Sequence, residues 1–71
     1  MTTVEEETPI DSIPAAAKAA IEKKVATGKI TMVEAVTKNG AVALYEASYT
    51  TKAGKKAEFA VKPDGTPTKE D

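Results

Sequence analysis

A stripe of apolar residues at helical spacing begins shortly after the N-terminus. Its members recur at steps of four, three, one and four residues, and they are Ile13, Ala17, Ala20, Ile21 and Val25. This periodicity, with no Gly or Pro after Pro14, predicts an amphipathic α-helix over residues 13–26. Asp11 or Ser12 would cap its first N–H groups, and Pro14 fits its first turn. Gly28 would end the helix in a left-handed conformation.

A β-hairpin is predicted directly after the helix, where the sequence becomes rich in Ile, Val, Thr and Met. Its strands are residues 29–38 and 41–51, and Asn39-Gly40 between them favours a two-residue turn. Alternation within the second strand separates two faces. One face holds Ala43, Tyr45, Ala47 and Tyr49, and the other holds Val42, Leu44, Glu46 and Ser48.

Further strands are predicted at both ends of this hairpin. Residues 56–62 alternate between apolar and polar side chains, which indicates a third strand. Residues 66–71 are expected to begin a short final strand, which Pro67 would confine to a sheet edge. The polar N-terminus, with three consecutive glutamates, is predicted to be a solvated lead-in. A short edge strand at residues 2–4 is the alternative.

The first hairpin strand does not follow simple alternation. Ile30 and Val33 are both apolar but lie on opposite parities. A bulge near Met32-Val33 would let both side chains face inward, and we predict one there. The two-residue turn at Asn39-Gly40 places Glu34 opposite Tyr45 and Val33 opposite Glu46.

These elements predict an α+β fold, in which one N-terminal α-helix packs on one face of a three- to four-stranded antiparallel β-meander. The predicted core contains Ile13, Ala17, Ile21, Val25, Ile30, Met32 or Val33, Tyr45, Ala47, Phe59 and Val61. The opposite face of the sheet is expected to lack cover from this chain. Residues 1–9 are predicted to be a flexible or edge-strand segment, residues 10–67 a single domain, and residues 68–71 a frayed C-terminus.

Composition excludes several classes of function. The 71 residues include no Cys and no His, so thiolate nucleophiles, disulfides and the residue used most for proton transfer near neutral pH are missing. Every basic residue is Lys and the formal net charge is −1, so no basic face suited to nucleic acid is expected. No apolar run is long enough for membrane insertion. We expect no cofactor, no metal and no enzymatic activity.

The open face of the predicted sheet carries candidate partner-binding residues. They are Val42, Leu44, Glu46, Ser48, Glu58 and Ala60. Val42, Leu44 and Ala60 would form a small apolar patch, and such a patch or an exposed edge strand is a reasonable docking surface. The plainer alternative is a solvated face, because half of its side chains are polar.

Two groups of charged residues are weaker candidates for a site. Glu34, Glu46 and Glu58 could align across neighbouring strands and, with Asp64, bind a cation. Glu34 with Glu46 could also act as an acid–base pair. The closely spaced oxygen ligands of a calcium loop are missing, so neither role is predicted. The lysines around Gly54 are interpreted as a solvated hairpin tip, with an anion site as the alternative.

Short motifs follow one another in a set order along the chain. They are Ser-Ile-Pro-Ala-Ala at 12–16, Gly28-Lys29-Ile30 followed by Val33, Leu-Tyr-Glu-Ala at 44–47, Phe59-Ala60-Val61, and Pro63-Asp64-Gly65. This order, which covers roughly residues 10–66, resembles the PepSY-like family of small secreted or periplasmic domains. Ala47 stands where the family usually has Val, and Ile13 where it has Leu.

The resemblance implies a helix over an antiparallel sheet, a periplasmic or secreted location, and no catalytic residues. It also implies binding or inhibition of a peptidase, with Tyr45 and Glu46 matching the most recognisable family motif. The alternative for this pair is a core position for the Tyr45 ring and an open-face position for Glu46.

Two functions from different classes follow from these observations. The first is a non-enzymatic exported domain that binds another protein, with a peptidase as the implied partner, through the open sheet face or an edge strand. The second is a small structural module that self-associates without a specific ligand. The expected assembly state is therefore a monomer or a weak homodimer.

Overall fold

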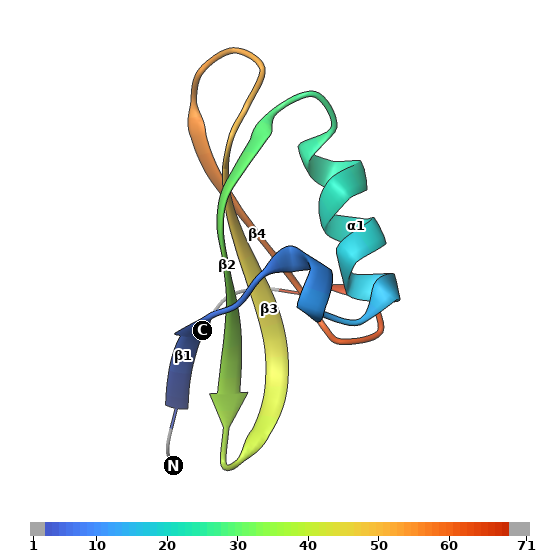
Figure 1. Ribbon diagram of the computed structural model, residues 1–71, viewed down its shortest axis with the longest axis vertical. Helices are drawn as coiled ribbons and strands as arrows, with labels where there is room; N and C mark the ends of the chain where they lie inside the picture. Colours follow the sequence, from blue (N-terminus) through green and yellow to red (C-terminus); the bar gives the residue numbers. More distant parts are fainter. Residues whose placement is uncertain (1–2, 69–71) are drawn as a thin grey trace.

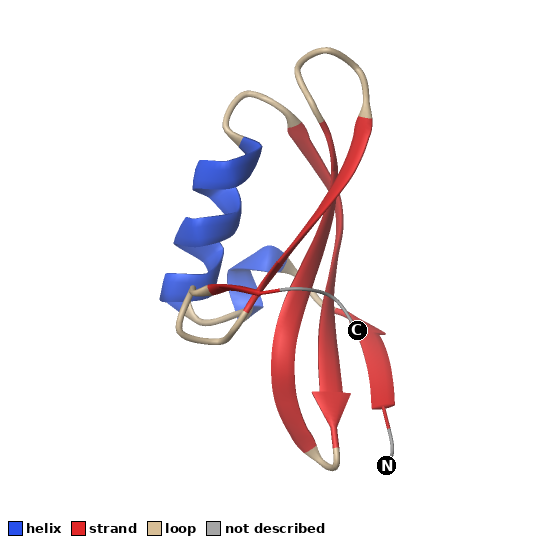
Figure 2. Ribbon diagram, turned by 180° about the vertical axis from the view of Figure 1, so that it is seen from behind, coloured by secondary structure: helices blue, strands red, loops and turns tan. Residues whose placement is uncertain are grey.

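An α-helix and a twisted sheet form the two layers of the molecule. The computed structural model describes residues 3–68. The elements are β1 (Thr3–Glu7), the 3-10 helix η1 (Ile10–Ser12), α1 (Ala15–Val25), β2 (Lys29–Lys38), β3 (Ala41–Thr50), β4 (Lys56–Val61) and β5 (Pro67–Thr68). The strands form one antiparallel sheet in the order β1-β2-β3-β4-β5, with α1 along one side (Figure 1). The view from behind shows the β2–β3 hairpin extending past the helix (Figure 2).

The predicted α+β fold is confirmed, since α1 packs on one face of an antiparallel meander. Within residues 3–68 the sheet has five strands rather than three or four, because each end of the chain adds an edge strand. β1 precedes the helix, so the helix is the first long element but not the first element. At the other end Thr68 pairs with Ala60 in β5, which agrees with the predicted final strand but shows that the predicted frayed segment 68–71 began one residue too early. Residues 69–71, also predicted to fray, lie outside the described residues.

The N-terminal segment is an edge strand over residues 3–7, which confirms the edge-strand alternative and extends it beyond residue 4; the favoured prediction of a lead-in without a strand is wrong there. Glu5 pairs with Val36, and the Thr8 amide donates a hydrogen bond to the Val33 carbonyl at 2.8 Å. β1 therefore satisfies backbone groups of β2 that would otherwise need water. Its five side chains are all exposed. Consecutive charged residues on such a strand discourage further pairing at the sheet edge.

The helix starts and ends differently from the prediction. α1 begins at Ala15, with Pro14 as its N-cap and no side-chain cap. Ser12 belongs to η1, and the Asp11 carboxylate accepts a hydrogen bond from Lys18 Nζ at 2.7 Å instead of capping. Ile13 precedes the helix but is still buried in the core. The apolar stripe was therefore a better guide to burial than to the helix boundary.

The end of the helix depends on Ala26 rather than on a left-handed Gly28. Ala26 has φ 52° and ψ −112°, the values of the first central residue of a type II′ turn. The Gly28 amide closes this turn on the Val25 carbonyl at 2.9 Å. Gly28 is required for space, because a Cβ on it would lie 2.3 Å from the Thr50 carbonyl oxygen. The turn thus brings the chain directly against the end of β3.

The β2–β3 hairpin has the predicted two-residue turn. Asn39 and Gly40 have φ values of 53° and 84°, which is the type I′ pattern, and Lys38 pairs with Ala41 across it. The register then shifts, since Thr37 pairs with Val42 but Val36 pairs with Leu44. The extra residue, Ala43, is a bulge that the sequence analysis did not include.

This bulge overturns the predicted pairing of the strands. Val33 lies opposite Ala47 instead of Glu46, and Glu34 lies opposite Glu46 instead of Tyr45. The physical reason is burial: the predicted pairing would place the Glu46 carboxylate beside Val33 in the core, whereas the shift places Ala47 there. A second shift, between Ile30 and Met32, is the predicted bulge, displaced to Thr31.

The core lies between α1 and the helix-facing side of the sheet. Its buried members are Ile13, Ala17, Ile21, Val25, Val33, Ala47, Tyr49 and Val61, with Ile10, Ala20, Ile30, Tyr45, Ala57 and Phe59 packed against them. Val33 rather than Met32 occupies the position that was left open, because the bulge at Thr31 brings Ile30 and Val33 to the same side. Ile21 and Val61 are the largest fully buried side chains within the described residues.

The opposite face of the sheet has a small apolar cluster of its own. Val36, Leu44 and Ala60 are 5%, 5% and 3% exposed. Leu44 lies directly across from Val36, and Ala60 lies one pair further along on β4. The expectation that this face lacks cover is therefore wrong for these three residues.

Neither helix described within residues 3–68 has the length and hydropathy needed to span a membrane.

Candidate functional site

The open face, defined as the side of the sheet turned away from α1, carries rows of side chains that run across the strands. The central row joins Glu7, Glu34 and Glu46 on three adjacent strands and continues to Ala60. The next row joins Met32, Ser48 and Glu58. Like charges directly opposite one another are unfavourable, so the central row costs some stability.

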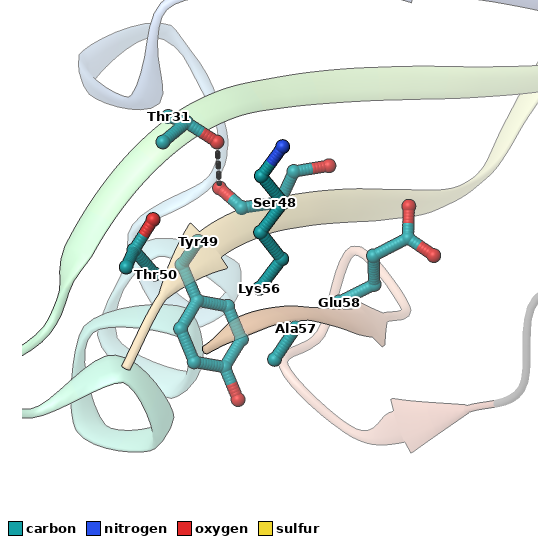
Figure 3. A pocket seen from close by; sticks show the side chains of 7 residues that line it. All are labelled: Thr31, Ser48, Tyr49, Thr50, Lys56, Ala57 and Glu58. Carbon is teal, nitrogen blue, oxygen red and sulfur yellow. Dashed lines mark hydrogen bonds between the residues drawn. The ribbon is translucent and has the colours of Figure 1, made fainter. Parts of the chain in front are cut away.

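A shallow hollow lies at the end of this face nearest the β3–β4 turn. It is lined by Thr31, Ser48, Tyr49, Thr50, Lys56, Ala57 and Glu58, which come from β2, β3 and β4 (Figure 3). Its volume is about 550 Å³ and it is open to solvent. Figure 3 shows Ser48, Lys56 and Glu58 on one side of the sheet and Tyr49 and Ala57 directed to the other.

The bulge at Thr31 helps to build the hollow. Thr31 is the extra residue of β2, and its Oγ1 donates a hydrogen bond to the Ser48 carbonyl at 3.0 Å. This bond holds the irregular part of β2 against β3. The depression arises because the short side chains of Ser48 and Thr50 lie beside the longer ones of Lys56 and Glu58.

Lys56 and Glu58 are the charged residues of the hollow. Both are exposed, and both project from β4 on the open face. Within residues 3–68 neither side chain forms a hydrogen bond or an ion pair. An ammonium, a carboxylate and several hydroxyls can recognise the polar groups of a peptide.

Displaced pKa values within the described residues lie away from the hollow. A hydrogen bond from Lys18, and then its charge, lower the pKa of Asp11, and the same contact raises the pKa of Lys18. Hydrogen bonds from the Thr66 side chain and backbone lower the pKa of Asp64 in the β4–β5 turn. All three groups are structural, because each stabilises a local turn or helix start.

The structure separates the six residues predicted to bind a partner. Ser48 and Glu58 line the hollow, and Glu46 belongs to the row of carboxylates. Leu44 and Ala60 are buried with Val36 and so do not form an exposed patch.

Val42 does not lie beside Leu44 on the open face. It pairs with Thr37 beyond the bulge at Ala43, and Val4 of β1 pairs with the same threonine. The bulge reverses the parity of the strand, so these side chains stand on the side that carries the helix. Val4 and Val42 are each 40% exposed. The predicted patch of Val42, Leu44 and Ala60 is thus wrong.

Sequence analysis missed five of the seven lining residues: Tyr49 and Ala57, which are directed to the other side of the sheet, and Thr31, Thr50 and Lys56. Thr50 and Lys56 continue the same parity as Ser48 and Glu58, so extending the alternation toward the turn would have found them. Thr31 could not be found in this way, because its position depends on a bulge displaced by one residue from the predicted place.

The weaker candidates show no built site. The described residues contain no group of three or more side chains placed to hold a metal ion. Near Gly54 the turn closes on itself, since the Gly54 amide donates to the Thr51 carbonyl at 2.8 Å. The lysines of this turn are exposed, as a solvated tip requires. Tyr45 is half-buried against the core, and Glu46 lies on the open face, which agrees with the alternative given for this pair.

A second depression lies between α1 and the β4–β5 hairpin. It is lined by Ala20, Lys23, Lys24, Phe59, Gly65 and Pro67. Lys24 Nζ stands 5.7 Å from the centre of the Phe59 ring, close enough for a cation–π interaction. Because its base is a core side chain covered by this lysine, the depression is a packing feature of the helix and hairpin.

Comparison with known proteins adds no assignment. No protein-family model, curated protein or solved structure matches the chain. The resemblance to PepSY-like domains therefore stays an expectation from the order of motifs, and function has to be argued from the surface itself.

Proposed function

We propose that this chain is a non-enzymatic domain that binds an extended segment of another protein on its open face, in the hollow between β2 and β4. The observation that carries the proposal is the hollow itself, which combines hydroxyls with a lysine and a glutamate that have no partner within residues 3–68. A surface that keeps polar groups available without burying them is suited to recognition of other polar groups.

The chemistry of the hollow favours a peptide over an apolar ligand. Ser48 and Thr50 offer hydroxyls that both donate and accept, which matches the alternating N–H and C=O groups of an extended backbone. Lys56 and Glu58 on the same strand would pair with side chains of either charge. The buried apolar cluster of this face, Val36, Leu44 and Ala60, does not line the hollow, so affinity would come mainly from polar contacts.

The partner class in this proposal is a peptidase. Support comes from the order of motifs that resembles PepSY-like domains, whose members occur in metallopeptidase propeptides. In this reading the chain is exported, to the periplasm or outside the cell, and covers part of the peptidase surface.

The test is a titration of the ¹⁵N-labelled chain with a catalytically inactivated secreted metallopeptidase, followed by amide chemical shifts. We expect shifts concentrated at Thr31, Ser48 and Glu58. A Ser48→Arg variant, which fills the hollow with a long side chain, is expected to lose these shifts. Ser12→Arg is the matched control, since Ser12 is exposed in η1 and remote in sequence from the hollow strands. Shifts absent from the hollow, or equal for both variants, would contradict the proposal.

A further inference from the structure

One edge of the sheet is covered for only part of its length. β4 contains six residues, but β5 pairs only with Ala60 and Val61. Residues 56–59 therefore form a strand edge that no other strand covers within residues 3–68. Unpaired strand edges are templates for another strand.

The hydrogen bonds at the two ends of β4 show which backbone groups face this edge. The Lys55 carbonyl accepts from the Thr51 amide at 2.8 Å, so residue 55 is directed toward β3. The Lys62 amide donates to the Thr66 carbonyl at 2.8 Å, so residue 62 is directed toward the opposite side. Because these directions alternate along a strand, the N–H and C=O groups of Lys56 and Glu58 point outward.

We propose that a second copy of this chain pairs with the β4 edge in an antiparallel, two-fold symmetric arrangement, with Lys56 opposite the partner's Glu58. The symmetry then places Glu58 opposite the partner's Lys56 as well. Each of the two residue pairs exchanges two backbone hydrogen bonds, and each brings an ammonium beside a carboxylate on the open face. The two sheets join into one, and both helices lie on the same side of it.

Charge selects this register among the symmetric ones. A pairing centred on residue 56 would put Lys56 opposite the partner's Lys56, and one centred on residue 58 would put Glu58 opposite the partner's Glu58. Both place like charges side by side, which is unfavourable. Of the pairings centred on residues 56 to 58, the one centred on Ala57 is the one that makes both outward residues complementary. Ala57 is also small, so its side chain leaves room at the symmetry axis.

The other outer edge of the sheet is unsuited to the same contact. On β1 the Thr8 amide is directed toward β2, so the backbone groups of Thr3, Glu5 and Glu7 point outward. A symmetric pairing centred on Glu5 places two glutamates opposite each other, and the negatively charged side chains on either side add to the repulsion. Charge therefore separates a repulsive edge, β1, from a self-complementary edge, β4.

The contact is small, which sets the concentration range for the test. It consists of a few residues on each side, less than the roughly 1,200 Å² typical of stable interfaces, so dimerisation is expected only in concentrated solution. Because the ion pairs are exposed to solvent, added salt should weaken the dimer.

The experiment is sedimentation equilibrium of the full chain and four charge variants over a wide concentration range. Lys56→Glu and Glu58→Lys each place like charges across the edge and should weaken dimerisation about tenfold. The double variant K56E/E58K exchanges the two charges and should restore it. An equimolar mixture of the two single variants should form a heterodimer and so associate more strongly than either variant alone. Glu5→Lys on β1 is the control and should dimerise like the wild type.

Each alternative outcome is informative. A chain that stays monomeric at every concentration, or single variants that dimerise like the wild type, would overturn the proposal. So would a mixture that associates no better than its components. Thr31→Arg separates this proposal from binding in the hollow, because it fills the hollow from β2, on the far side of β3 from the β4 edge, and this variant should still dimerise.

Discussion

The two faces of the sheet are built from the same strands but differ in burial: one packs against α1, whereas most of the other is in contact with solvent. On the face covered by α1, Tyr45, Ala47 and Tyr49 of β3 belong to the core or pack against it, and Ile21 and Val61 are completely buried. Among residues 3–68, the open face buries a three-residue cluster, Val36, Leu44 and Ala60, and also carries carboxylates, hydroxyls and a lysine. Stability therefore resides mainly on the covered face, whereas the open face is available for contacts with other molecules.

Which face a side chain occupies depends on the alternation of residues along its strand. The two bulges of the hairpin set this alternation in β2 and β3. Each extra residue, Thr31 in β2 and Ala43 in β3, reverses the alternation beyond it. Together they keep Val33 and Ala47 on the covered face and Glu34 and Glu46 on the open one. The difference teaches that the composition of each face depends on backbone irregularity as much as on side-chain identity.

The largest effect is expected when a cavity is made in the core on the covered face of the sheet. Ile21→Ala removes a fully buried side chain from the contact between α1 and the sheet. We expect the free energy of unfolding to fall by about 2–5 kcal/mol, measured by urea denaturation, which would leave little of a small domain's stability. Val42→Ala is the control, since Val42 is 40% exposed. Equal losses for both variants would show that the faces do not differ as described.

The next test concerns the junction between the covered face and the helix end. Gly28→Ala would place a Cβ 2.3 Å from the Thr50 carbonyl oxygen, and also 3.2 Å from the Val25 carbonyl oxygen. Both neighbours are backbone atoms, so the turn or the end of β3 has to move. We expect a loss of about 1–3 kcal/mol in thermal or urea unfolding. Gly54→Ala tests a different cause, because its φ of 87° is strained for alanine but its surroundings are open.

Sequence alone predicted the covered face well. The helical stripe, the Asn39-Gly40 turn and the alternation of residues 56–62 depend on local preferences, and each led to the correct element. The inward positions followed from them, since apolar residues must be buried whatever the detailed geometry.

The open face and the edges were predicted less well, for a physical reason. The bulge at Ala43 is favoured by a long-range balance, in which the core accepts Ala47 and excludes Glu46, and no local signal marks it. β1 has low intrinsic strand preference and forms because β2 offers backbone partners. The hollow depends on a third feature, the bulge at Thr31, which lies one residue away from the predicted place.

A smaller effect is expected at the end of the helix on the covered face. Ala26 has φ 52° and ψ −112°, which glycine adopts without steric cost. Ala26→Gly should raise the stability by about 0.5–1 kcal/mol, because relief of backbone strain exceeds the greater freedom that glycine gives the unfolded chain. Ala19→Gly, at an exposed position inside α1, should lower the stability instead. A loss at both positions, measured by the midpoint of thermal unfolding, would argue against strain at Ala26.

A substitution on the open face is expected to raise the stability by a similar or smaller amount. Glu34 lies between Glu7 and Glu46 in the row of carboxylates. Glu34→Gln removes one charge from the row and should stabilise the fold by about 0.2–1 kcal/mol, more at low salt than at high salt. Glu6→Gln is the matched control, because Glu6 lies opposite Ala35 and outside the row. Similar gains for both variants would mean that overall net charge, rather than the row, is responsible.

The smallest effect expected is a change in acid sensitivity at the β4–β5 turn, which packs against the start of α1. Asp64 accepts a hydrogen bond from the Thr66 amide at 2.9 Å, and the contacts with Thr66 lower the pKa of Asp64. A lowered pKa in the folded state gives a stabilisation that is present above the pKa of an unfolded aspartate and is lost as the pH falls through the lower value. Asp64→Asn keeps the acceptor oxygen but cannot titrate, so its thermal midpoint should fall less steeply in acid than that of the wild type. Because Asp64 is exposed, the difference should be slight, and its presence would assign part of the acid sensitivity to a turn on the covered side. Identical acid profiles would place that sensitivity elsewhere, with the Asp11–Lys18 contact at the helix start as the next candidate.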